Sequence, residues 1–196
     1  MTEKQEQRIK DKITKIKRDL AADKRKWGGF YDDSRGLRYL PPELYLKIKD
    51  YKGALRYFNW FDKNFPEDVG FPGFLFEYSF TLFKNGKIKR AEKKILQTFI
   101  SNTYIIDNFL GRELIDFEKE ENSNWEKEVV LKHFPYSKED SEFNDFASWL
   151  EEYMETPKFM EIKNEFINIE KKLKHEPVGP KRTELVKRRS SLLNNI

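Results

Sequence analysis

Four aliphatic residues near the N-terminus follow the period of an amphipathic helix. Ile9, Ile13, Ile16 and Leu20 lie four, three and four positions apart, and the positions between them are charged or polar. This spacing predicts a helix over about residues 3–26 with a narrow apolar face, ended by Trp27-Gly28-Gly29. So narrow a stripe does not stabilise a helix alone in water. We therefore expect the N-terminal helix to dock on the rest of the chain or to pair with a second chain.

Helix-period patterns continue through the rest of the chain. Together with their breakers they predict further helices over about 41–49, 51–65, 72–84, 87–101, 104–110, 125–133, 138–155, 157–174 and 181–193. Ser137 with Asp140 is interpreted as a capping box at the start of the helix over 138–155. No segment alternates apolar and polar residues over a length useful for a strand. The pattern predicts an all-α fold.

The last two predicted helices carry apolar stripes of their own. Ile162, Phe166, Ile169 and Leu173 mark one arm, and Leu185, Leu192 and Leu193 mark the other. The sequence Pro-Val-Gly-Pro at 177–180 joins the arms as a turn. The chain is thus expected to have three parts: an N-terminal basic amphipathic helix at 1–27, a helical core at 28–110, and a C-terminal helical extension at 111–196 that packs on the core.

Two central segments share one spacing with an offset of 37 residues, measured from Ala54 to Ala91. In the first, Tyr51 is followed by Ala54, Phe58, Phe61 and Pro66; in the second, Ile88 is followed by Ala91, Ile95, Thr98 and Thr103. A small residue, a large residue four later and a proline twelve later resemble the second helix of the tetratricopeptide repeat. The resemblance covers about residues 41–103 and implies two helix hairpins. The alternative is a helical bundle whose hairpins share this spacing by coincidence.

The resemblance implies a concave groove that would hold a partner peptide. Phe76, Phe80 and Phe83 fall on positions that line this groove in the family, so they are the candidate partner-binding residues. The family's carboxylate clamp uses lysines and asparagines there, and the phenylalanines here do not match it. An aromatic groove receives either an apolar helix of a partner or a helix of its own chain. Two repeats need capping by flanking helices, so filling by the chain itself is the favoured interpretation, most readily by a terminal helix.

The amino-acid composition excludes several classes of function. Charged residues make up 37% of the 196 residues and aromatic residues 15%, and there is no cysteine, so disulfide and thiolate chemistry are excluded. The longest apolar run is far shorter than a membrane span, and the first residues lack the apolar core of a secretory signal. These features predict a cytoplasmic protein. Residues 1–26 hold ten Lys/Arg against five Asp/Glu, and residues 113–155 hold four against fourteen, which is typical of charge-guided contacts.

Candidate chemistry is sparse. His133 and His175 are 42 residues apart with no carboxylate or hydroxyl pattern around them, so we interpret both as surface or helix-end residues. No phosphate-binding glycine motif is present, and we expect no cofactor, metal or catalytic residue. Lys187, Arg188 and Arg189 form a compact basic patch. The predicted function is a non-catalytic protein–protein interaction or scaffold module; a nucleic-acid-associated protein using its basic ends, or an enzyme of unrecognised type, remains the alternative.

Overall fold

The computed structural model describes residues 1–32, 36–119, 123 and 125–194. Within these residues the fold is all-α, without strands, as the sequence predicts. The helices are α1 (Glu3–Lys26), α2 (Leu40–Lys47), α3 (Tyr51–Asn64), α4 (Pro72–Lys84), α5 (Ile88–Ser101), α6 (Ile105–Phe109), α7 (Lys127–His133), α8 (Asn144–Met154), α9 (Pro157–His175) and α10 (Pro180–Asn194). Short 3-10 turns precede α2 (Leu37–Tyr39) and α8 (Ser141–Phe143).

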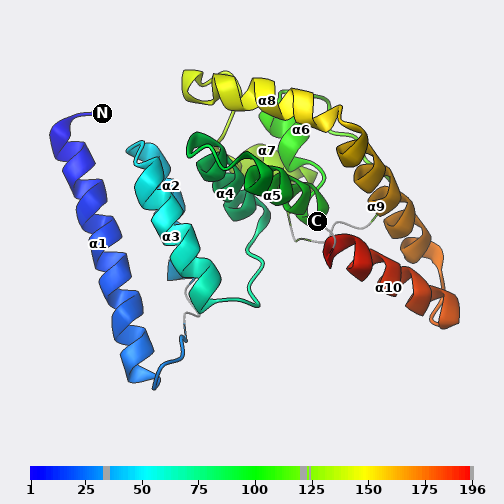
Figure 1. Ribbon diagram of the computed structural model, residues 1–196, viewed down its shortest axis with the longest axis horizontal. Coiled ribbons are helices and arrows are strands. Elements are labelled where there is room, and N and C mark those ends of the chain that lie inside the picture. The colour runs from blue at the N-terminus through cyan, green and yellow to red at the C-terminus, as the bar shows by residue number, and fades with distance from the viewer. Residues whose placement is uncertain (33–35, 120–122, 124, 195–196) are drawn as a thin grey trace.

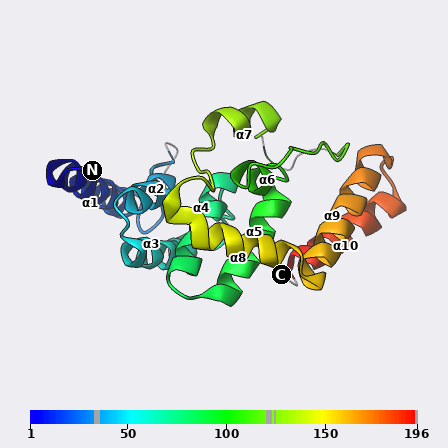
Figure 2. The same ribbon diagram turned by 90° about the horizontal axis from the view of Figure 1, so that it is seen from above.

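The helices follow one another from one end of the molecule to the other. Figure 1 shows α1 at one edge, α4 and α5 in the middle, and α9 with α10 at the opposite edge. Figure 2 shows α8 running beside α4 and α5 and leading into α9, while α7 lies on another side of the same centre. Helix α1 and the hairpin of α9 and α10 therefore lie on opposite sides of the central helices (Figure 1).

Helix α4 is the centre of the core. Every residue from Pro72 to Leu82 is buried, as expected of a helix with apolar side chains on all sides and few polar ones among them. One side of α4 packs in a cluster with α3 and α5, in which the rings of Phe58 and Tyr78 stack at 4.0 Å. Its other side faces α6 and α8 within the main cluster. A helix surrounded in this way fixes the positions of the helices around it.

The N-terminal helix docks on the body, as its stripe predicts. The side chains of Ile13, Ile16 and Leu20 are buried, and α1 packs against α2 and the preceding 3-10 turn. A capping box starts the helix: the Thr2 hydroxyl accepts from the backbone N–H of Gln5, and the Gln5 side chain accepts from that of Thr2. Two backbone N–H groups at the helix start, which have no acceptor within the helix, are thus hydrogen-bonded.

The start of α8 differs from the sequence-based expectation. The Ser137 hydroxyl accepts from the backbone N–H of Glu139 at 3.2 Å, and the α-helix begins only at Asn144, after a 3-10 turn. Ser137 and Asp140 therefore belong to a turn and the capping-box prediction is wrong. Phe143, which is buried against Phe80 at 4.3 Å between ring centroids, holds the chain in this turn.

The two alanines of the shared spacing are expected to be sensitive to size. Ala54 and Ala91 have no exposed surface. Replacing either with leucine should lower the unfolding free energy by about 1–3 kcal/mol through overpacking. Ala22→Leu on the exposed side of α1 is the matched control, because its side chain faces solvent. Urea titrations that give the same midpoint for all three variants would contradict close helix contacts at these alanines.

Candidate functional site

The predicted aromatic groove is filled by the chain itself. Phe76 and Phe80 have no exposed surface, and Phe83 is half-buried. The ring of Phe76 contacts Phe109 and Phe134, and the rings of Phe80 and Phe83 both contact Phe146 of α8. These three residues therefore offer no open groove to a partner in this structure.

The filling segment is not a terminal helix, so that part of the expectation is wrong. Helix α8, α6 and the chain between α7 and α8 cover the phenylalanines. Helix α8 suits the task because Phe146 and Trp149, one turn apart, present two rings to Phe83. The stripe of α1 is aliphatic and is already used against α2.

The basic patch at the C-terminus is largely paired within the hairpin of α9 and α10. Arg188 Nε lies 2.6 Å from Glu165 Oε1, and Arg189 Nη1 lies 3.1 Å from Glu170 Oε1. Lys187 is exposed. Two of the three cations thus serve to join the helices. The stripe of α9 is buried at Phe166, Ile169 and Leu173; on α10, the side chain of Leu193 lies outside the described residues.

Loss of the Arg189 side chain is expected to be costly, whereas loss of Lys187 is not. Glu170 is 5% exposed, so Arg189→Ala leaves a carboxylate buried beside α10 without its partner. We expect Arg189→Ala to lower the unfolding free energy by about 2 kcal/mol and Lys187→Ala to change it by less than about 0.5 kcal/mol. Chemical denaturation of both variants measures the difference, and equal midpoints would contradict a structural role for Arg189.

A buried carboxyl on α4 escaped the sequence reasoning. Tyr136 donates its hydroxyl to Glu77 Oε1 at 2.6 Å, while Oε2 is buried without a partner. Burial raises the pKa of Glu77 to about 8 and the pKa of Tyr136 well above its ordinary value. The signal was available, because Glu77 is the one charged residue within the apolar run Pro72–Phe83. The pair buries an acidic group inside the core, and the charges of Glu43 and Lys47 act on it.

Both histidines lie at the ends of helices. His133 is the last residue of α7 and His175 the last of α9, and both are exposed, so the helix-end interpretation is confirmed. Among the residues that the structure describes, no cluster of histidine and acidic side chains could hold a metal ion. Likewise, no helix within the described ranges is long and apolar enough to cross a bilayer.

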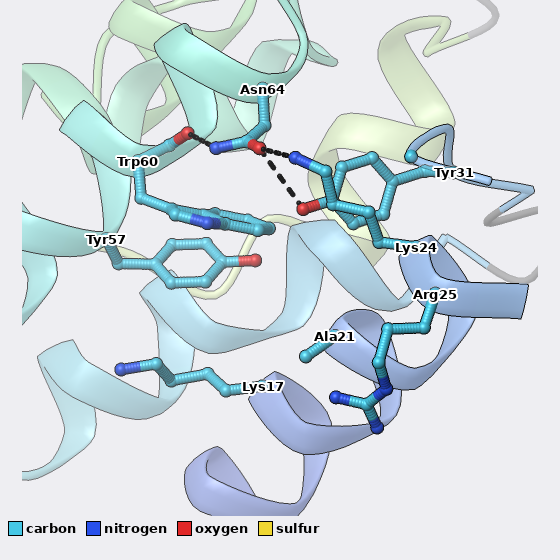
Figure 3. A pocket seen from close by; sticks show the side chains of 9 residues that line it. Lys17, Ala21, Lys24, Arg25, Tyr31, Tyr57, Trp60 and Asn64 are labelled. Atoms are coloured by element: carbon cyan, nitrogen blue, oxygen red, sulfur yellow. Dashed lines mark hydrogen bonds between the residues drawn. The ribbon is translucent and has the colours of Figure 1, made fainter. Parts of the chain in front are cut away.

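An open pocket lies between α1 and α3. It has a volume of about 540 Å³, within the usual range for ligand pockets. Figure 3 shows its wall of aromatic rings and the cationic side chains that face it. The lining residues are Lys17, Ala21, Lys24, Arg25, Gly29, Tyr31, Tyr57, Trp60 and Asn64. No local pattern in the sequence predicted that α1 would lie opposite Tyr57 and Trp60 of α3.

Hydrogen bonds hold the pocket in shape. Asn64 Oδ1 accepts from Lys24 Nζ at 2.9 Å and from the Tyr31 hydroxyl at 3.2 Å, and Asn64 Nδ2 donates to the Trp60 carbonyl at 2.8 Å (Figure 3). The Tyr57 hydroxyl donates to the Arg38 carbonyl at 2.7 Å. One asparagine thus joins α1, α3 and Tyr31 of the chain that follows α1.

The pocket is positively charged. Lys17 and Arg25 are exposed, and neither forms an ion pair with an acidic side chain of the described residues. Lys24 lies 5.1 Å from the centroid of the Tyr31 ring. No carboxylate is among the lining residues that the structure describes. Comparison of the chain with protein-family models, curated proteins and solved structures finds no match, so the pocket itself is the basis for a functional proposal.

Proposed function

We propose that the protein is a non-catalytic protein–protein interaction module, built on tetratricopeptide-like helix pairs, that binds its partner in the pocket between α1 and α3. The observation that carries this proposal is the pocket itself, with three aromatic rings and three cations around about 540 Å³. Tryptophan, tyrosine and arginine are the residues that contribute most at protein interfaces. Among the described lining residues there is no nucleophile in contact with a base and no pair of carboxylates, so binding fits the pocket better than catalysis.

The helix pairs support the tetratricopeptide-like part of the proposal. Helix α2 packs on α3 and α4 packs on α5, and the two alanines of the repeat spacing are completely buried. The predicted groove residues are covered, so the interaction surface is moved to the outer side of α3, where α1 forms the opposite wall.

The proposal is tested by selecting random peptides displayed on phage against the full chain. Ala21 lines the pocket and Ala22 does not, so Ala21→Trp should block the pocket while Ala22→Trp, on the same helix, should leave it open. We expect selected peptides to bind the unmodified chain and Ala22→Trp, and to lose binding to Ala21→Trp by at least about tenfold. A failure to select any peptide, or equal binding to both variants, would show the proposal to be wrong.

A further inference from the structure

The chemistry of the pocket also points to the class of partner. We infer that the site binds an acidic segment of a partner protein in which a large apolar side chain lies next to Asp or Glu. This inference rests on the proposed function and specifies its ligand. The carboxylates would lie along α1 and the apolar side chain against α3.

The charge of the site comes from one face of α1. Lys17, Ala21, Lys24 and Arg25 are spaced so that they follow one another along the same side of the helix. Asp23, the nearest acid on the helix, does not line the pocket; its Oδ2 accepts from the backbone N–H of Asp32 at 2.7 Å, and its charge also acts on Tyr31. Ala21 leaves room between the cations. A ligand entering here therefore meets three cationic side chains and no carboxylate among the described lining residues, and carboxylates are the complementary groups on a polypeptide.

The apolar part of the site comes from α3 and the loop after α1. Trp60 is half-buried, and its ring lies 5.1 Å from Tyr57 and, in a T-shaped arrangement, 5.9 Å from Tyr31, both measured between ring centroids. The rings form an apolar wall beside the cations of α1. Apolar side chains gain from leaving water in such a place in proportion to the area that they bury. A segment with only acidic side chains would leave the aromatic wall exposed to water. The inferred ligand therefore includes an apolar side chain next to its acids.

The packing of the rings favours a polypeptide over a single-stranded nucleic acid. Stacking of a base requires an open ring face. Tyr57 is 4% exposed and lies against Trp60 at an interplanar angle of 36°, while Phe65 and Trp60 pack in a T-shaped arrangement with 5.8 Å between ring centroids. Part of the ring surface is thus used in contacts between the rings. What they offer a ligand is an apolar wall with cations beside it, which suits an amino-acid side chain flanked by carboxylates.

The inference is tested with a defined probe. Fluorescence anisotropy compares a labelled peptide, acetyl-Glu-Asp-Phe-Glu-Asp-amide, with its counterpart in which every acid is lysine. The test variant is the double substitution Lys17→Glu and Arg25→Glu. The matched control is Lys4→Glu with Lys12→Glu, which changes the net charge of α1 equally at exposed positions outside the pocket. Thermal melting of both variants confirms that they fold.

We expect the acidic peptide to bind the unmodified chain and the control, and to lose at least about tenfold in affinity on the test variant. The lysine peptide should show the reverse preference and bind the test variant better than the unmodified chain. Added salt should weaken acidic-peptide binding, because the charges are partly exposed.

Two results would overturn the inference. If selected peptides compete at the pocket but the acidic probe binds no better than its lysine counterpart, the function stands and the ligand class is wrong. If oligo(dT) binds more tightly than the acidic peptide and loses affinity on the test variant, the occupant is a nucleic acid. Absence of any peptide sensitive to Ala21→Trp instead contradicts the proposed function, so the two failures are distinct.

Discussion

Replacing Phe80 by alanine is expected to lower the unfolding free energy by about 3–5 kcal/mol, because removal of a buried ring leaves a cavity that the core fills only in part. Phe80 has no exposed surface and contacts the rings of Tyr51, Phe143 and Phe146. The cavity would lie where α8 packs on α4, so the cost should appear as a lower midpoint in urea denaturation followed by circular dichroism.

Phe30→Ala is the control for this prediction. Phe30 is 79% exposed, after the end of α1, and its loss should change stability by less than about 0.5 kcal/mol. If Phe80→Ala were as stable as Phe30→Ala, Phe80 would have to lie in an open groove, and the covering role of α8 would be wrong. The experiment therefore separates a core ring from a binding ring.

Stability is expected to fall as the pH rises through the neutral range, because of Glu77. Burial raises the pKa of Glu77 from its ordinary 4.5 to about 8. Between these values the folded protein keeps the proton and the unfolded chain releases it, so a higher pH favours unfolding. This group alone should lower the unfolding free energy by up to about 1.4 kcal/mol per pH unit over that window. Below pH 4.5 its contribution is constant.

Glu77→Gln isolates this effect because it keeps an acceptor for the Tyr136 hydroxyl without an ionisable proton. Urea titrations from pH 5 to pH 8, the window set by the raised pKa, should show the advantage of Glu77→Gln over the unmodified chain growing with pH. Glu128→Gln, at an exposed position on α7, should run parallel to the unmodified chain. If the stability of Glu77→Gln also changed with pH in the same way as that of the unmodified chain, Glu77 would have to be charged in the folded protein.

The sequence by itself determined the helical character of the chain and most of its helix boundaries. The stripe of Ile13, Ile16 and Leu20 predicted both α1 and its docking, and the alanine spacing correctly marked completely buried positions. These features depend on neighbours within a few residues, so they are visible in periodicity and in turn residues. The same local reasoning placed the capping box at Ser137 wrongly, because contacts of Phe143 with the distant Phe80 decide where α8 begins.

Only the tertiary structure decided which segments meet. It placed α8 rather than a terminal helix over Phe80, paired Arg189 with Glu170, and brought Tyr136 to Glu77. It also set Lys17 and Trp60, 43 positions apart in the sequence, on opposite walls of one pocket. An amphipathic stripe shows that a helix has a buried face, but many faces have similar width and apolarity. Which of these faces pack together depends on the shapes and charges of side chains far apart in the sequence, and local sequence patterns do not show which segments will meet.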